Sequence, residues 1–198
     1  MNMTKAPWLA VVMSLLTVSS FAFAGLAKAG AVPDGFIGVP WGASADQVKQ
    51  IMNERGYTQL KGSAPGQLVF KGAFAGVPCQ LLFYLIANSF YSGTAEICSR
   101  SGYALLPQST YKQTVDMLSE KYGPPQTRES KQLEDNNGKK HPQEGARWTL
   151  TDSKTSDSFT ISADFGVTWF MDDTGDQYVA NFHYSADSLH QRLKTKEY

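Results

Sequence analysis

The three histidines come first in a search for chemistry, because a neutral imidazole can act as a base or bind a metal ion near pH 7. His183, Asp187 and His190 lie close enough in sequence to form a surface metal site or to supply the base of an enzyme, whereas His141 stands apart. No G-x-S-x-G, H-E-x-x-H, P-loop or dinucleotide glycine motif accompanies them. We therefore expect solvated histidines, and we predict a protein that is not an enzyme and has no catalytic residue, metal or cofactor.

A second candidate site is the acidic turn formed by Asp172, Asp173 and Asp176 around Gly175. Clusters of carboxylate oxygens are the ligands that calcium prefers. Aspartate and glycine are also the residues that a tight hairpin turn needs, and no glutamate follows at the spacing of a calcium loop. The sequence favours the hairpin turn and leaves calcium binding open.

The two cysteines, Cys79 and Cys98, suggest a disulfide. Each lies in an apolar or β-prone stretch, and a turn-like segment, Asn88–Gly93, lies midway between them. In an antiparallel hairpin centred on that turn, the two residues would face each other across neighbouring strands. In an oxidising compartment such a pair is the default expectation, and closing the loop would stabilise the fold by roughly 3 kcal/mol. Without a C-x-x-C motif, we expect a structural disulfide rather than a redox centre.

The N-terminus predicts export. Lys5 precedes the apolar run Trp8–Val18, and Ala22-Phe23-Ala24 places small residues where signal peptidase requires them. The apolar run is too short to cross ~30 Å of hydrocarbon, so residues 1–24 read as a signal peptide. Cleavage would leave Gly25, not a lipid-modified cysteine, at the new N-terminus. We expect a soluble periplasmic or secreted protein with no membrane span and no lipid anchor.

The elements that position these residues follow a repeated pattern, a helix followed by three strands. In the first unit, Ser44 and Gln47 form a capping box ahead of a helix that ends at Gly56. Strands are expected at Gln67–Lys71, Pro78–Ala87 and Thr94–Arg100. In the second strand, the residues Leu81–Ile86 are apolar without alternation, so apolar side chains point to both faces of the strand. This pattern predicts that both of its faces are covered.

The second unit repeats this order. Ser109 precedes a helix that ends at Gly123, and a last helix, Ala186–Lys196, follows with Ser185 as its cap. Its strands are expected at Ala146–Leu150, Ser158–Met171 and Gln177–Ser185. The polar segment 124–145 lacks the apolar residues of a buried element and predicts a mobile surface loop.

The predicted fold is α+β, with two tandem helix-β-β-β units forming an antiparallel sheet packed by helices, plus a C-terminal helix. It occupies a single domain, 36–198, made of repeats 36–103 and 104–198, after a flexible Gly/Ala-rich lead at 25–35. Basic and acidic residues balance at 18 each. No basic excess is present to neutralise a phosphate backbone, so nucleic acid is not expected as a partner.

Aromatic residues near the predicted turns are the candidate binding residues. Phe90 and Tyr91 lie at one hairpin turn, Trp169 and Phe170 near the other, and Trp41 beside the first helix. Aromatic side chains at turns anchor partners because they bring a large apolar area at a small entropic cost. The alternative, which we favour, is that they close the ends of a small core.

Two motifs carry a resemblance to known proteins. The stretch Gly38–Val48, which contains Trp41-Gly42-Ala43-Ser44, and the stretch Lys121–Pro125 resemble a group of uncharacterised exported bacterial proteins. More distantly, a capped helix followed by an antiparallel sheet in tandem is similar to β-lactamase-inhibitor-like proteins and to the small lipoprotein of the outer-membrane barrel-assembly machine. Those relatives commonly have Gly-Met-Thr where this chain has Trp-Gly-Ala-Ser, and the lipoprotein has a lipidated cysteine that this chain lacks, so no functional residue carries over. The resemblance implies a non-catalytic, protein-binding module.

These observations favour a non-catalytic binding protein that recognises another envelope protein. The alternative is a small-molecule or lipid carrier that uses a cavity between sheet and helix. A homodimer is left open.

Overall fold

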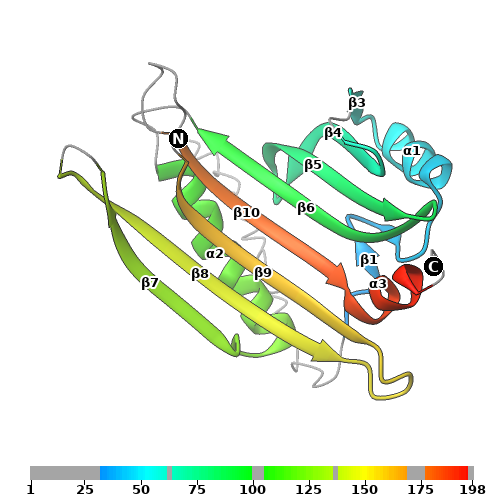
Figure 1. Cartoon of the computed structure of the whole chain (residues 1–198). Coiled ribbons are helices and arrows are strands. Elements are labelled where there is room, and N and C mark those ends of the chain that lie inside the picture. The colour runs from blue at the N-terminus through cyan, green and yellow to red at the C-terminus, as the bar shows by residue number, and fades with distance from the viewer. Residues whose placement is uncertain (1–31, 62–63, 100–104, 136–137, 169–176, 196–198) are drawn as a thin grey trace, which may run out of the picture.

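The computed structural model describes residues 32–61, 64–99, 105–135, 138–168 and 177–195. Within them the chain forms one large antiparallel sheet, a small hairpin and three helices (Figure 1). The α+β class predicted from the sequence is therefore confirmed. The first half of the chain contains β1 (Gly35–Phe36), β2 (Val39–Pro40), α1 (Ala45–Glu54), β3 (Thr58–Leu60), β4 (Gln67–Phe74), β5 (Val77–Ile86) and β6 (Ser89–Ser99). The second half contains α2 (Leu105–Tyr122), β7 (Thr127–Glu134), β8 (Lys140–Thr151), β9 (Ser158–Thr168), β10 (Gln177–Ala186) and α3 (Asp187–Lys194).

The large sheet has eight strands in the order β3-β4-β5-β6-β10-β9-β8-β7. The strands on each side follow chain order from the edge inward, and β6 meets β10 at the centre (Figure 1). That pair runs from Tyr178 opposite Ser99 to Ser185 opposite Ser92. Four strands follow each of α1 and α2, not the three that the sequence pattern predicts, because the edge strands β3 and β7 carry no apolar alternation.

Helix α1 begins and ends as its sequence predicts. The Ser44 hydroxyl accepts a hydrogen bond from the Gln47 backbone N–H, and the Gln47 side chain accepts one from the Ser44 N–H at 2.8 Å. Gly56 follows the last turn with φ +76°, a left-handed conformation that glycine adopts without a steric penalty. Val48 and Met52 on the inner side of the helix are fully buried.

The core lies on one face of the sheet. A row of directly paired residues crosses six strands there, and all six are buried: Phe70, Leu81, Ala95, Phe182, Ala163 and Ala146. Helix α2 packs on β6, β9 and β10. Its buried side chains Tyr111, Val115 and Leu118 belong to the same core cluster. The core therefore joins both halves of the chain.

Helix α3 lies on the other face of the sheet. Thr160 alternates with the buried Ile161, and its hydroxyl donates to the Asp187 carboxylate at 2.6 Å. Contacts with β5, β6, β9 and β10 keep α3 over one end of that face (Figure 1). The predicted cap is wrong, because Ser185 belongs to β10 and the N-cap residue, Ala186, makes no side-chain cap bond. The start of α2 is also earlier than predicted, at Leu105, so Ser109 lies inside the helix.

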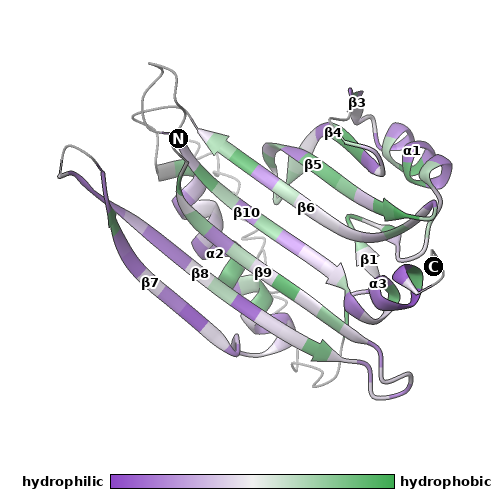
Figure 2. Ribbon diagram, viewed as in Figure 1, coloured by the Kyte–Doolittle hydropathy of each residue, from purple (hydrophilic) through white to green (hydrophobic). Residues whose placement is uncertain are grey.

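The predicted mobile loop 124–145 is wrong. Most of it is β7 and the first part of β8, paired from Thr127 opposite Arg147 to Glu134 opposite Lys140. Every residue of β7 except Leu133 is exposed, and Figure 2 shows this strand as mostly hydrophilic. An edge strand gains its order from backbone hydrogen bonds to one neighbour and needs few apolar side chains. Polar composition therefore does not distinguish it from a loop.

The end of the predicted flexible lead is also ordered. Gly35 and Phe36 pair with Pro40 and Val39 in the β1–β2 hairpin, and Phe36 is buried. The part of the lead before residue 32, and the signal peptide, lie outside the described residues.

Candidate functional site

The face of the sheet opposite the core carries two rows of residues that cross all eight strands by direct pairing. We call this surface the open face and define it by these rows. The first row is Thr58, Lys71, Gln80, Glu96, Asn181, Asp164, Gly145 and Glu129. The second is Leu60, Val69, Leu82, Thr94, His183, Ser162, Arg147 and Thr127.

The open face is mostly polar and of mixed charge, with Leu60, Val69 and Leu82 as its large apolar residues, and only Val69 in the two rows is fully buried. Lys71 and Arg147 supply positive charge, while Glu96, Asp164 and Glu129 supply negative charge. Burial raises the pKa of the Asp164 carboxyl, an effect opposed by a hydrogen bond from Ser162 and by the charge of Arg147. A surface that carries both signs of charge is better suited to bind a protein partner than a polyanionic one.

His183 is held in place as a neutral group. Its Nδ1 lies 3.0 Å from the Thr94 hydroxyl and its Nε2 lies 3.3 Å from the Ser92 hydroxyl. Because Ser92 donates its proton to the Tyr184 carbonyl, the proton between Ser92 and His183 belongs to Nε2. Burial lowers the pKa of His183. The Ser92–His183 pair is thus a structural hydrogen bond, and its imidazole nitrogen is not aimed as a base at a nucleophile.

The structure does not bring His183, Asp187 and His190 into a metal site. Asp187 accepts from Thr160, and the His190 ring stacks on Tyr91 with the ring centroids 4.3 Å apart. Among the described residues, no group of three or more His, Cys, Asp or Glu side chains could hold a metal ion. The acidic turn at Asp172, Asp173 and Asp176 lies outside the described residues.

The predicted disulfide is wrong in this structure, where Cys79 and Cys98 are both free. The β5–β6 register pairs Gln80 with Glu96, which places Cys79 on the core face beside Leu81 and Cys98 on the opposite face. Burial raises the pKa of both thiols to about 12, and for Cys98 a hydrogen bond that its Sγ donates to Glu96 adds to the effect. Neither thiol is therefore a reactive nucleophile at neutral pH.

The aromatic residues predicted as binding anchors have different positions. The turn between β5 and β6 is formed by Ala87 and Asn88, both at positive φ, so Phe90 lies inside β6. Phe90 is 0 % exposed and stacks on Trp41 with the ring centroids 5.1 Å apart. The half-buried Trp41 donates from its Nε1 to the Pro33 carbonyl at 2.8 Å.

Tyr91 is half-buried against α3 by its stack on His190. It is the residue that the register shift between Tyr84 and Leu85 leaves without a partner on β5. Trp169 and Phe170 lie outside the described residues. For Phe90 and Trp41, the structure supports the alternative in which they close one end of the core.

Strand β5, which has apolar side chains on both faces, is covered on one face and partly covered on the other. Leu81 and Phe83 are buried in the core, while Leu82, Tyr84 and Ile86 are half-buried. Helix α3 contacts β5 on this second side. Helix α3 thus provides part of the covering that the sequence predicts for the second face of β5.

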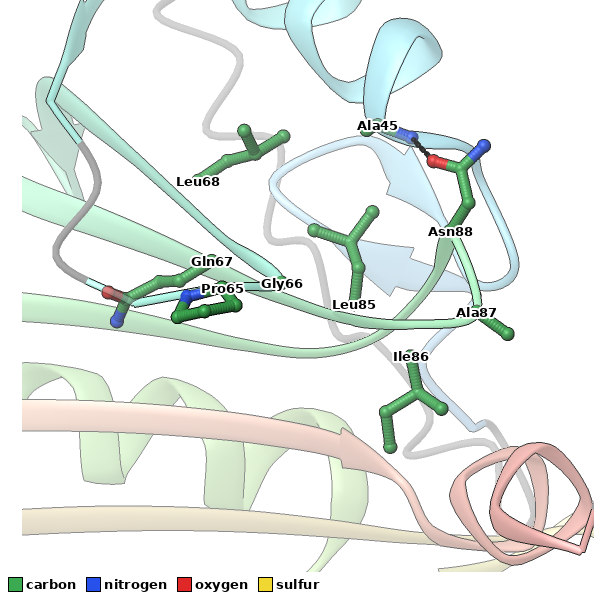
Figure 3. A pocket seen from close by; sticks show the side chains of 9 residues that line it. All are labelled: Ala45, Pro65, Gly66, Gln67, Leu68, Leu85, Ile86, Ala87 and Asn88. Atoms are coloured by element: carbon green, nitrogen blue, oxygen red, sulfur yellow. Dashed lines mark hydrogen bonds between the residues drawn. The ribbon is translucent and has the colours of Figure 1, made fainter. Parts of the chain in front are cut away.

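A pocket of about 520 Å³ lies where β4 and β5 approach α1. Leu68, Leu85 and Ile86 are among the residues that line it (Figure 3). Two side-chain amides, Gln67 and Asn88, also line it, and the Asn88 Oδ1 already accepts a hydrogen bond from the Ala45 N–H at 3.0 Å, at the start of α1 (Figure 3). This pocket therefore combines an apolar surface with an Asn88 oxygen that already has a partner.

The open face was not identified from the sequence, although one signal for it was present. In β9, Phe159, Ile161 and Phe165 alternate strictly with polar residues, and this alternation indicates a sheet with one uncovered face. Aromatic residues near the turns are a stronger sequence signal than the polar residues of this face. The pairing register that aligns the rows across eight strands could not be read from the sequence.

No protein-family model matches the chain, and no curated protein matches it. The resemblance to exported bacterial proteins and to tandem helix-and-sheet binding proteins therefore stays a prediction. Within the described residues, no helix is long and apolar enough to cross a membrane.

Proposed function

We propose that this chain is an exported, non-catalytic binding protein that recognises another envelope protein through its open face. The observation that carries the proposal is the asymmetry of the sheet. Two helices and the core cover one side, whereas on the other side two mostly polar rows cross eight strands, and α3 is the one described helix there, over one end.

The dimensions of the open face suit a protein partner. Eight strands at about 4.8 Å spacing span roughly 34 Å, and about seven residues along each strand, at roughly 3.4 Å per residue, give an area on the order of 800 Å². That area equals the share of one partner in a standard protein–protein interface. A pocket on this face, beside Asp164 and Asn181, holds about 130 Å³. This volume is smaller than the several hundred cubic ångströms of a typical small-molecule site.

The proposal extends to the architecture. We interpret the domain as two tandem units, α1 with β3–β6 and α2 with β7–β10, which share a continuous sheet. The support is the order of elements, in which each helix precedes four antiparallel strands and the last strand of each set meets the other at the centre. The unit is then a helix and four strands.

Export remains part of the proposal because it rests on the N-terminal sequence. The mature chain should begin at Gly25 and lie in the periplasm or outside the cell. Intact-mass measurement of the protein recovered from the envelope fraction tests this, and an uncleaved N-terminus would contradict it.

Site-specific photocrosslinking in the producing cell tests the binding surface. Benzoylphenylalanine at Gln80 or Thr149, both exposed on the side of the open face, should give one discrete crosslinked protein. The same probe at Lys112 or Gln113, exposed on α2 and therefore on the other side of the sheet, serves as the matched control. Adding Arg147→Glu should remove the crosslink at Gln80, and Lys112→Glu should not.

Crosslinks that form equally from α2, or that survive Arg147→Glu unchanged, would show that the open face is not the binding surface. Circular dichroism of each variant confirms that the loss of a crosslink does not reflect unfolding.

A further inference from the structure

A second surface of the molecule, on the covered side, has the form of a small-molecule site. A pocket of about 410 Å³ lies between α2, the β1–β2 hairpin and the sheet. Its apolar walls include Phe36, Phe74, Met117 and Leu118. Met117 is 50 % exposed although it is a large apolar residue, and it lies at this pocket. The volume falls in the range of pockets that bind small organic molecules.

One wall of this pocket contains a polar group without a partner. Thr114 is 1 % exposed, and its hydroxyl makes no hydrogen bond within the described part of the chain. A threonine inside a helix ordinarily bonds to the carbonyl four residues earlier, as Thr110 does with Leu106 at 2.8 Å. Leaving such a group unsatisfied is costly, and a ligand that enters the pocket would remove the cost.

The same helix face supplies a positive charge. Thr114, Leu118 and Lys121 are spaced at i, i+4 and i+7 and all line the pocket. The Cα atoms of Thr114 and Lys121 are separated by about 10.5 Å along the helix. Lys121 forms no salt bridge with a described residue, and its ammonium group lies 5.0 Å from the centroid of the Tyr122 ring.

Asp34 also lines the pocket and carries the opposite charge. Its side chain is short and exposed, whereas the lysine stem is long enough to follow a ligand across the opening. The charged group on the helix that carries Thr114 is therefore the positive ammonium group of Lys121.

We propose that this pocket binds an amphipathic monocarboxylate with a hydroxyl group at its far end, of the chemical class of the ω-hydroxy fatty acids. The carboxylate pairs with Lys121 at the opening, the alkyl chain contacts Phe36, Met117 and Leu118, and the hydroxyl bonds to Thr114. This site lies on the side of the sheet opposite the open face and does not depend on the protein-binding proposal.

Titration of the exported chain with 10-hydroxydecanoate, decanoate and decanol, followed by calorimetry, tests the proposal. We expect 10-hydroxydecanoate to bind at one site roughly tenfold more tightly than decanoate, the effect of one hydrogen bond to a buried group. Thr114→Val should abolish that preference, and it should not unfold the protein because it removes an unsatisfied hydroxyl. Lys121→Met should abolish the preference for decanoate over decanol, whereas Lys112→Met, on the same helix but outside the pocket, should change neither.

Methionine methyl NMR locates the site independently. The Met117 methyl signal should shift on addition of 10-hydroxydecanoate, and the signal of Met52, buried on the inner side of α1, should not. Absence of a Met117 shift, equal binding of the two acids by the unmodified chain, or tighter binding of decyltrimethylammonium than of decanoate would each overturn the proposal.

Discussion

Phe90 and Tyr91 are neighbours in sequence with different structural roles. Phe90 is fully buried between Phe83 and Trp41, while Tyr91 lies at a β-bulge and contacts His190 on the other side of the sheet. A bulge inserts one residue into a strand and redirects its side chain. Adjacent aromatic residues of β6 therefore stabilise two different layers of the molecule.

Alanine substitutions at these two positions should separate their contributions to stability. Phe90→Ala removes a buried ring and should lower the free energy of unfolding by about 3–5 kcal/mol. Tyr91→Ala removes one half-exposed stack and should cost about 1 kcal/mol. Urea unfolding followed by far-UV circular dichroism measures both values. Equal losses would contradict the assignment of Phe90 alone to the core.

The cysteines show the limit of sequence reasoning at this scale. The turn-like segment midway between the cysteines correctly indicated that the two residues lie on neighbouring strands, since Cys79 is in β5 and Cys98 in β6. Whether they share a face depends on the register, and a shift of one residue reverses the face of every side chain. That register is fixed here by a two-residue turn and a bulge, neither of which the apolar pattern reveals.

At the scale of elements, end signals in the sequence were as informative as the apolar pattern. The capping box of Ser44 and Gln47 and the left-handed Gly56 locate both ends of α1. Ser109 carries a similar local signal, but it lies within α2 and donates to the Leu106 carbonyl. A serine before an apolar run is thus a reliable cap only when the reciprocal glutamine or glutamate follows.

These two serines provide a matched test. Ser44→Ala should lower the free energy of unfolding by about 1 kcal/mol, because a backbone N–H loses its cap. Ser109→Ala should change it by only a few tenths of a kcal/mol, since alanine is the better residue inside a helix. Thermal unfolding of the two variants and the unmodified chain compares them directly. A larger loss for Ser109→Ala would contradict the position of the α2 start.

The strands of the core could be predicted, and the strands of the edges could not. β9 and β10 carry apolar residues at the alternating period of a sheet that packs on a core, and β5 contains a continuous apolar run. β7 reads as a polar linker, yet it pairs along its whole length with β8. The candidate site could not be predicted for the same reason. The open face consists mostly of polar residues, which do not stand out in a sequence as aromatic residues do.

At the scale of the whole molecule, the two halves share one core. The buried cluster contains Phe70 and Leu81 from the first half and Trp148 and Phe165 from the second. The central β6–β10 pair also joins the halves by backbone hydrogen bonds. Neither half can expose its inner face without disrupting the other, so we expect a single cooperative transition.

Tryptophan fluorescence can test this expectation, because Trp41 belongs to the first half and Trp148 to the second. In a variant of the chain from Gly25 onward, which lacks Trp8, with Trp169→Phe and Trp148→Phe, the Trp41 signal should unfold at the same urea midpoint as the circular dichroism signal. The complementary variant, with Trp169→Phe and Trp41→Phe, should show the same coincidence for Trp148. Trp148 is buried and donates to the Gly123 carbonyl, so the variants should differ in overall stability. Separate midpoints within one variant would show that the halves unfold independently.

The position of β10 has a consequence for the biogenesis of the protein. This strand is the last of the sheet in chain order, yet it lies at the centre between β6 and β9. Until it has been synthesised and delivered to the site of folding, β6 and β9 each present an unpaired edge, a template for pairing with other chains. Closure of the sheet is thus coupled to the arrival of residues 177–186. Under the proposed export, the chain would stay incompletely folded until its C-terminal part has crossed the membrane.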